Sequence, residues 1–339
     1  MSEGDASNGL VSDPSAGADV YLFSNNQIPE LVKAIAIAEL GGTRVDAIKA
    51  ANTESCVNTV TYEGGVYGVP FTGNTWFMYY DKSVFSDTDI LSLDTMLTKG
   101  KVAFPLENSW YIAAFYVAGG CTLFGEDGAD EEAGIDFGGD KAVAVTDYLV
   151  DLVKNPNFRN GDVGDNRDAK AFFSGTWDYN KARDAYGDNL GIAPAPSINL
   201  NGESRQLRAF AGSKAIGCNP STPRYRAHPE IVVELAMHLG SPEAQRRHYE
   251  ARDIIPTDVN VVVDDDLARA QMDAMDYASI VEPLQSNMSN YWKPADAMGQ
   301  ELVVGTVTHK NAAAKTAAMN ASMNSSVVEW FSPKGGSYE

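Results

Sequence analysis

The chain has 339 residues, of which 44% are hydrophobic and 21% are charged, and this length predicts two domains, each with a full core. Its formal net charge of -20 argues against nucleic acid as a partner and against adhesion to anionic lipid, because such a surface repels phosphate groups. No apolar run reaches the roughly 18 residues of a membrane-spanning helix, and residues 1–18 lack the basic and apolar regions of a signal peptide.

The first third of the chain alternates between apolar runs typical of strands and stretches with helical spacing. A strand followed by a loop and a helix is a common unit of α/β folds. The predicted elements are a strand over Val20–Phe23, a helix over Glu30–Leu40 that Gly41 and Gly42 end, a hairpin over Tyr62–Gly68 with Gly64-Gly65 as its turn, and a strand over Val69–Tyr80 long enough to link two lobes.

The same alternation continues through the rest of the chain, so the predicted fold class is α/β. No Pro/Gly/Ser-rich linker divides the chain in the middle, so the sequence does not suggest two domains joined by a single linker. The further predicted elements are strands at Lys101–Phe104, Gly191–Pro196 and Phe210–Cys218, helices at Trp110–Val117, Gly138–Lys154 and Pro229–Gly240, a helix starting at Ser241-Pro242-Glu243, an extended connector at Ile254–Pro256, mostly helical chain from Asp264 to about Val328, and a polar tail from Ser332.

The residues that most often carry metal or covalent chemistry are scattered. Three cysteines, Cys56, Cys121 and Cys218, form no CxxC pair and are predicted to be buried thiols, the alternative being one disulfide with one thiol left over. The histidines form no HExxH or zinc spacing, and the glycines form no phosphate-binding or nucleophile-elbow motif. The sequence therefore predicts no metal site and no cofactor.

Three tryptophans lie in polar surroundings. Trp110, Trp177 and Trp292 are each flanked by amide, hydroxyl or carboxylate side chains. A flat ring can bury the C–H face of a pyranose while polar neighbours bind its rim hydroxyls, so three such clusters favour a sugar site. The alternative for each ring is a core position with its N–H satisfied at the edge, and this interpretation is kept for Trp76 and Trp330.

Two further patterns leave alternatives open. Asn25, Asn26 and Gln27 close the first predicted strand, where they either cap the next helix or face a ligand at the carboxyl end of the strand. A glycosidase needs two carboxyl groups held about 5–10 Å apart, and an acidic sequence offers many. For that alternative Asp178, beside Trp177, is the first suspect.

Several long stretches carry a family signal that covers nearly the whole chain from about residue 13. They are ADVYLFSNNQIPELVKAIAIAEL (Ala18–Leu40), YEGGVYGVPFTGNTWFMYYDKS (Tyr62–Ser83), Leu93–Gly125, AFFSGTWDY (Ala171–Tyr179), Phe210–Pro220 and the region around Trp292. On these residues the chain resembles the maltose/maltodextrin-binding proteins of bacterial ABC importers, which are family 1 extracellular solute-binding proteins, particularly those of the Gram-positive type.

The resemblance implies a two-lobe periplasmic-binding-protein-like fold of type II. Lobe 1 would comprise residues 1–73 and 209–256, and lobe 2 residues 74–208 and 257–339, with the sugar in the cleft between them. Family members begin with a lipoprotein signal and then a strand, a helix and a strand of lobe 1, which the sequence given does not contain. Lobe 1 is therefore expected to be N-terminally truncated, with an exposed sheet edge and a lower stability than in a full relative.

The resemblance also implies the function. The chain would bind maltodextrin-type oligosaccharides, close by a hinge motion and deliver the sugar to the membrane subunits of an ABC permease, without a cofactor and as a monomer. It would lie outside the cytoplasm and be associated with the membrane, either lipid-anchored at the cell surface or in the periplasm. A carbohydrate hydrolase and a truncated paralogue that binds no sugar are the alternatives. The ligand-binding residues expected are Asn26, Gln27, Asn74, Asn108, Trp110, Tyr111, Trp177, Asp178 and Trp292.

Overall fold

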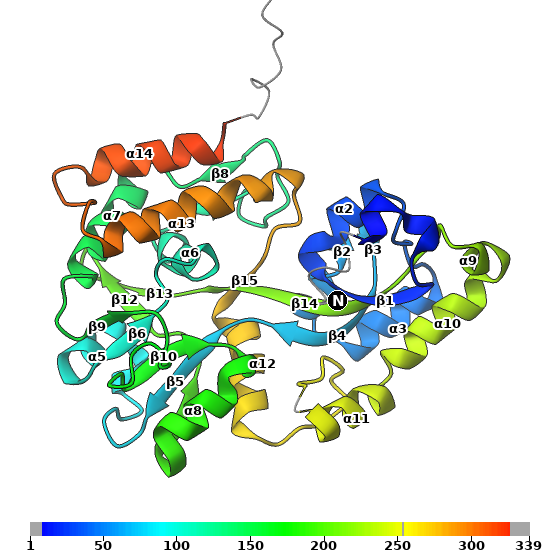
Figure 1. Ribbon diagram of the computed structural model, residues 1–339, viewed down its shortest axis with the longest axis horizontal. Coiled ribbons are helices and arrows are strands. Elements are labelled where there is room, and N and C mark those ends of the chain that lie inside the picture. The colour runs from blue at the N-terminus through cyan, green and yellow to red at the C-terminus, as the bar shows by residue number, and fades with distance from the viewer. Residues whose placement is uncertain (1–8, 253, 326–339) are drawn as a thin grey trace, which may run out of the picture.

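A computed structural model describes residues 9–252 and 254–325 and has two lobes, each built from strands and helices (Figure 1). Strands β14 (Ala209–Cys218) and β4 (Val69–Asn74) run between the two lobes. The predicted α/β class and the two-lobe architecture are therefore confirmed. The residue boundaries given above for the lobes stay a prediction.

Strand β14 is the centre of the first sheet because it pairs with three other strands. β1 (Val20–Ser24) is antiparallel to its C-terminal half, and β4 is antiparallel to it over Gly212–Ile216. β15 (Ser279–Val281) is parallel to its first three residues. Every residue of β14 except Lys214 is buried, as the small apolar sequence predicts. This one strand therefore brings together segments that lie far apart in the sequence.

The second sheet has the strand order β11-β5-β10-β6-β9 and is covered by helices on both faces. Successive side chains of a strand point to opposite faces. In β5 (Phe77–Asp81), Met78 and Tyr80 accordingly join one core, whereas Phe77 and Tyr79 join another. The remaining strands of this sheet are β6 (Val102–Phe104), β9 (Phe158–Asn160), β10 (Ala171–Ser174) and β11 (Leu190–Ala193).

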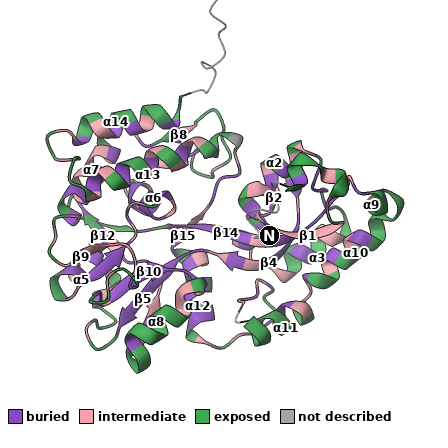
Figure 2. Cartoon of the chain, in the orientation of Figure 1, coloured by how far each residue is buried: buried purple, intermediate pink, exposed green. Residues whose placement is uncertain are grey.

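The helices of the second lobe form two layers. α8 (Tyr179–Tyr186) and α12 (Asp266–Tyr277) contribute to the core on one face of the five-stranded sheet, and the others contribute to the core on its opposite face. Figure 2 shows the buried residues along the strands and the exposed residues on the outer helical surfaces. The helices of the second layer are α5 (Leu93–Lys99), α6 (Ser109–Ala118), α7 (Gly139–Leu152), α13 (Ser289–Val303) and α14 (Ala312–Met323).

The first lobe is smaller and packs its helices around β1, β4 and β14. Its core contains Phe23, Leu31, Val69 and Val232. Its helices are α2 (Ile28–Lys33), α3 (Thr43–Ala51), α4 (Glu54–Asn58), α9 (Pro223–Ala227), α10 (Pro229–Leu239) and α11 (Pro242–Arg252). The short elements of both lobes are the hairpins β2 (Thr61–Tyr62)–β3 (Gly65–Val66), β7 (Thr122–Leu123)–β8 (Ile135–Asp136) and β12 (Ser197–Leu200)–β13 (Glu203–Gln206), and the 3-10 turns η1 (Pro14–Ala16), η2 (Asn25–Gln27), η3 (Asp89–Leu91), η4 (Thr176–Asp178), η5 (Gly187–Asn189) and η6 (Ser286–Met288).

The predicted helix over Glu30–Leu40 is wrong in its second half. α2 ends at Lys33, and Ile35 adopts a left-handed φ of 55°. The chain then runs beside the sheet, where the N–H of Ala38 donates to the carbonyl of Cys218 (2.8 Å). Backbone pairing with β14 therefore overrides the helical composition of this stretch. Gly42, with a φ of 55°, precedes α3 instead of ending a longer helix.

Two other local predictions need correction. The hairpin at Tyr62–Gly68 is present, but its turn is formed by Glu63 (φ 49°) and Gly64 (φ 83°). The stretch Val69–Tyr80 does link the two sheets, but as two strands, because Thr75 and Trp76 separate β4 from β5.

Three further predictions are confirmed, whereas the strand expected at Gly191–Pro196 ends at Ala193 and the expected truncation of lobe 1 stays a prediction. All three cysteines are buried and free, and Trp76 is buried with an exposed fraction of 0%. The C-terminal part is mostly helical as far as Met323. Trp330 and the polar tail from Ser332 lie outside the described residues.

Candidate ligand-binding site

Three strand ends meet at residues Ala211–Ser213 of β14 and position the polar side chains of the candidate site. Asn74, the last residue of β4, lies opposite the second residue of this trio. Asn25, which follows β1, accepts a hydrogen bond through its Oδ1 from the backbone N–H of the third residue (2.9 Å). Glu282, which follows β15, donates its backbone N–H to the carbonyl of the first residue (2.9 Å). Three segments of the chain are thereby held side by side.

The middle residue of this trio has to be small. A Cβ atom at Gly212 would lie 2.5 Å from Oδ1 of Asn25, closer than two such atoms can approach. The glycine therefore lets the Asn25 amide lie directly over the strand.

A cavity of about 440 Å³ opens at this junction. It is lined by Ser24, Asn25, Asn26, Asn74, Trp110, Trp177, Glu282 and Trp292. A neighbouring cavity of about 600 Å³ shares Asn26, Glu282 and Trp292 with it and extends over α2 and the β2–β3 hairpin. Five of the nine residues expected to bind ligand, namely Asn26, Asn74, Trp110, Trp177 and Trp292, thus line one space.

The three tryptophans reach the cavity from different elements. Trp110 stands in the first turn of α6, and Trp177 lies in η4 directly after β10. Their ring centroids are 5.9 Å apart with an interplanar angle of 39°. Trp177 has an exposed fraction of 53%, so about half of its surface is open to contact. Trp292 in α13 packs edge-on against Phe210 (5.8 Å) and keeps part of its surface open to the cavity.

Four of the expected residues, Gln27, Asn108, Tyr111 and Asp178, do not line either cavity. Asn108 caps α6 by accepting a hydrogen bond from the backbone N–H of Trp110 (2.9 Å). Tyr111 is buried and stacks on Trp76 (5.3 Å, 22°), and burial raises the pKa of its hydroxyl. Adjacent residues at the start of a helix point in different directions. Asn108 and Tyr111 therefore hold α6, which carries Trp110, without facing the cavity.

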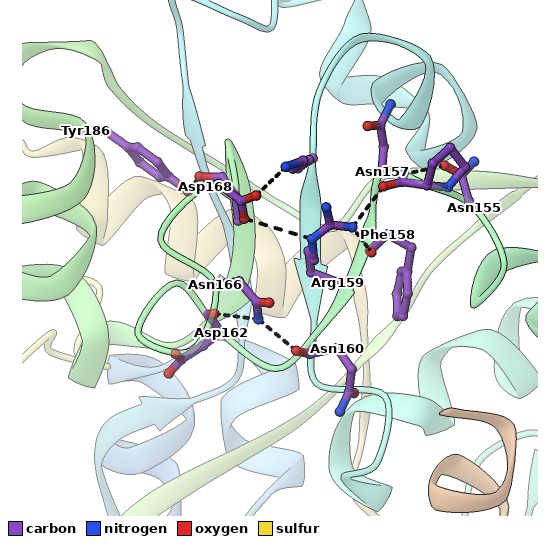
Figure 3. Close-up of polar contacts among 12 residues, drawn as sticks. Asn155, Asn157, Phe158, Arg159, Asn160, Asp162, Asn166, Asp168 and Tyr186 are labelled. Carbon is purple, nitrogen blue, oxygen red and sulfur yellow. Dashed lines mark hydrogen bonds and ion pairs between the residues drawn. The ribbon is translucent and has the colours of Figure 1, made fainter. Parts of the chain in front are cut away.

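Asp178 is held away from the cavity by a polar network. Its Oδ2 accepts from Ser174 Oγ (2.6 Å), and its Oδ1 pairs with Lys181 (2.9 Å). Lys181 also pairs with Asp162 (3.0 Å). Figure 3 shows how the loop around Asp162 is fixed, since the amide of Asn166 donates to the backbone carbonyl of Asp162 (3.1 Å) and also to that of Asn160. This network supports η4, which carries Trp177.

Sequence inspection missed Glu282 as a site residue. Its side chain has an exposed fraction of 5%, and burial raises the pKa of its carboxyl to about 7, while a hydrogen bond from the Asn26 amide acts in the opposite direction. A single carboxyl between Val281 and Pro283 gave no motif. The only signal was a charged residue directly after the apolar pair Ile280–Val281.

Metal chemistry finds no support in the part of the chain that the structure describes. Among those residues no group of three or more His, Cys, Asp or Glu side chains is arranged to hold a metal ion. No helix within residues 9–252 and 254–325 is long and apolar enough to cross a membrane.

Residues 1–274 match the family model of the bacterial extracellular solute-binding proteins. The chain belongs to this family. Among its relatives, the galactooligosaccharide-binding protein of Bacillus subtilis (strain 168) is 22% identical over 331 residues, which cover 89% of this chain and 76% of that protein. The maltooligosaccharide ABC transporter solute-binding lipoprotein of Streptococcus pneumoniae (strain ATCC BAA-255 / R6) is 25% identical over 305 residues, which cover 79% and 68%.

Solved structures share the fold over nearly the whole chain. One structure, described as being with acarbose, is 45% identical and has a TM-score of 0.86, covering 96% of this chain and 88% of its own. The maltodextrin-binding protein of L. casei BL23 without ligand is 22% identical and has a TM-score of 0.88, covering 96% and 89%. The family consists of extracellular binding proteins of transporters, so this chain is a binding protein and not an enzyme.

Proposed function

We propose that this chain is the substrate-binding component of an ABC carbohydrate importer and that it captures maltodextrin-type oligosaccharides. The observation that carries the proposal is the cavity of about 440 Å³, in which three tryptophan rings border the same space as the amides of Asn26 and Asn74. The rings cover sugar faces, and the amides donate to and accept from rim hydroxyls. The maltooligosaccharide and maltodextrin named for two relatives support the same class of ligand.

Capture is proposed to proceed by hinge closure. Lobe 1, taken as residues 1–73 and 209–256, supplies Asn25 and Asn26, and lobe 2, taken as residues 74–208 and 257–339, supplies Trp110 and Trp177. A sugar that contacts both sets binds the closed arrangement more tightly and therefore shifts the protein towards it. The closed form then docks on the membrane subunits of the permease. We take it to be a monomer that a lipid anchor holds on the outer face of the cell membrane.

The nine expected ligand residues divide into two groups in this proposal. The five that line the cavity contact the sugar directly. Three of the other four hold the tryptophan-bearing elements in place, as the cap of Asn108 on α6, the stacking of Tyr111 on Trp76 and the pairing of Asp178 with Lys181 illustrate. No cofactor takes part.

The test is a calorimetric and thermal-shift titration of the full chain with maltose, maltotriose, a longer maltodextrin, acarbose and a galactooligosaccharide, with xylose as the control. A ligand that binds only the folded protein stabilises it by about 2.7 kcal/mol at 100 times its Kd. We expect a dose-dependent rise in Tm with the glucans and no sugar consumed. A cooperative melt that no glucan shifts contradicts the proposal, and disappearance of maltotriose from the mixture contradicts a pure binding role.

A further inference from the structure

The backbone on both sides fixes the position of Glu282. Its N–H is bound to the carbonyl of Ala211, and Leu284, two residues later, packs into the core of the first lobe. The side chain lines both cavities and has an exposed fraction of 5%. This carboxyl is therefore built into the wall that the two cavities share, at the point where the lobes meet.

The hydrogen-bonding capacity of the site is only partly used. The Asn26 amide hydrogen-bonds the Glu282 carboxyl, but the buried Oε1 of Glu282 has no hydrogen-bond partner. The buried Nδ2 of Asn25, which borders the same cavity, also has none, because only its Oδ1 is engaged, by Ser213. Buried polar groups are normally paired, so a free acceptor and a free donor together indicate a ligand that supplies their partners. A sugar hydroxyl is such a group, since it donates one hydrogen bond and accepts others.

Other charged groups surround the cavity but do not pair with this carboxyl. Glu30 and Lys33 on α2 and Glu63 on the β2–β3 hairpin line the larger cavity with Tyr62. The elements packed on β15 carry Lys214 on β14 and Asp273 and Asp276 on α12. Burial first, and the Asn26 amide second, determine the pKa of Glu282. No histidine is among the residues that line the two cavities.

We propose that Glu282 determines sugar affinity by accepting a hydrogen bond from a sugar hydroxyl as a carboxylate, and that sugar capture at neutral pH expels a proton from this residue to the solvent. The inference rests on the proposed function, because it needs a sugar in the cavity. It makes capture weaker as the surroundings become acidic.

The direction of the pH dependence follows from the linkage between sugar binding and proton binding. Without sugar, burial raises the pKa of Glu282 to about 7, because the charged carboxylate is deprived of water. A hydroxyl that donates to Oε1 favours the ionised form and lowers the pKa in the complex. The affinity for sugar therefore reaches its full value above the pKa that Glu282 has in the sugar-free protein. It falls as the pH drops through that pKa, by at most about tenfold per pH unit.

The experiment is isothermal titration calorimetry of the full chain with maltotriose between about pH 5.5 and pH 8.5, in buffers of different ionisation enthalpy. For the unaltered chain we expect a Kd about tenfold larger at the acidic end and a net release of protons near neutral pH. Glu282→Gln keeps the shape and the bond to Asn26 but cannot ionise, so its Kd should change less than about twofold over the same range. Glu30→Gln, which changes an exposed carboxyl of the same cavity, is expected to keep the pH dependence.

Each outcome decides between the two proposals. A Kd that does not depend on pH, proton uptake instead of release, or the same pH dependence in Glu282→Gln overturns the role of Glu282 but leaves sugar capture intact. Absence of maltotriose binding at every pH overturns both proposals. If Glu282→Gln does not melt cooperatively, Glu282→Met replaces it, and the proton count of the unaltered chain still decides the sign.

Discussion

Trp76 and Trp177 show how the same side chain serves the core in one place and the site in another. Trp76 has an exposed fraction of 0% and packs against Phe104, Tyr111 and Phe173, whereas Trp177 has an exposed fraction of 53%. A Cβ at Gly175 would lie 2.1 Å from the Trp177 ring, so this glycine permits the ring to lie across the chain at that point. Burial therefore distinguishes the core ring of Trp76 from the cavity-lining ring of Trp177.

Alanine substitutions should separate the two roles. Trp76→Ala is expected to lower the free energy of unfolding by about 3–5 kcal/mol, because it leaves a large buried cavity. Trp177→Ala should change that free energy by less than about 1 kcal/mol and weaken maltotriose binding about tenfold, or ~1.4 kcal/mol. Urea unfolding and calorimetry measure the two quantities. Equal losses of stability in the two variants would contradict the assignment.

The ionisation of Glu282 predicts a second effect, on stability. Its pKa rises from 4.5 in the unfolded chain to about 7 in the folded protein. The contribution of the neutral Glu282 carboxyl to the free energy of unfolding is therefore fully present below about pH 4.5 and is lost as the pH rises towards 7. Glu282→Gln should accordingly be more stable than the unaltered chain by about 3 kcal/mol at pH 8. The gain should vanish near pH 4.5 in urea unfolding without ligand. An equal gain at both pH values would refute this origin.

Sequence patterns predicted the tryptophans that line the cavity but only part of its polar lining. Trp110, Trp177 and Trp292 were visible because polar residues surround each ring in the sequence itself. Glu282 was not, because its position depends on the meeting of strand ends at β14, and no local pattern records such a meeting. Asn25 was visible only as one of three polar residues after a strand, with helix capping as the alternative. Tyr111 was expected at the site because it adjoins Trp110, yet its direction on α6 turns it into the core.

At the scale of elements, α13 shows how closely a helix must pack to position a site residue. A Cβ at Gly299 would lie 2.2 Å from the carbonyl oxygen of Leu106, so α13 approaches the backbone before α6 directly. The same helix carries Trp292 about two turns earlier. This close contact therefore helps to fix the helix that carries Trp292.

Gly299→Ala is expected to lower the free energy of unfolding by about 1–3 kcal/mol, because a rigid backbone atom blocks the added methyl group. The displaced helix should also weaken maltotriose binding. Gly41→Ala is the matched control, since no atom lies within 4 Å of a Cβ at that position. Urea unfolding of both variants measures the difference, and a Gly299→Ala protein as stable as the control would contradict the packing argument.

A second element contact depends on a histidine. His309, between α13 and α14, has both ring nitrogens 2.7 Å from carboxylates of α7, one from Asp147 and one from Asp151. The hydrogen bond to Asp147 first, and that to Asp151 second, raise the pKa of His309 above 6.5. The protonated ring therefore joins two helical segments.

This bridge should weaken in alkali. Because the folded pKa of His309 is raised, its stabilisation is complete below about pH 6.5 and is lost as the pH rises through the folded value. The Tm difference between the unaltered chain and His309→Gln should therefore shrink from about pH 6 to pH 9. His238→Gln, an exposed histidine on α10, is the control. A difference that is constant with pH would rule out the bridge.

The fold was predictable where a periodic pattern and a buried face agree. β14 and α6 are largely apolar, and both lie within one residue of the predicted bounds. The prediction of a helix over Glu30–Leu40 is wrong in its second half because the backbone of Ala38 pairs with that of Cys218. Cys218 is 180 positions away in the sequence, so no local pattern indicates this pairing. The break at Thr75–Trp76 cannot be seen in the sequence, because the residues on both sides of it have the composition of one continuous strand.

At the scale of the whole molecule, two crossing strands join lobes that carry different parts of the cavity. Ligand contacts in both lobes predict that maltotriose reduces the radius of gyration in small-angle X-ray scattering. Trp177→Ala should require a higher sugar concentration for the same compaction. An unchanged radius at saturating sugar, with binding confirmed by calorimetry, would contradict hinge closure.

The position of β14 also decides when the protein can fold during its synthesis. β1 ends at Ser24, and its partner strand ends at Cys218, so the ribosome must add nearly the whole strand β14 before the N-terminal segment can pair. At about 5–20 residues per second, the N-terminal segment stays unpaired for roughly 10–40 s after it is made. β4 waits for the same strand. The first lobe is thus assembled late, and its unfinished chain remains available to a chaperone or an export channel throughout that interval.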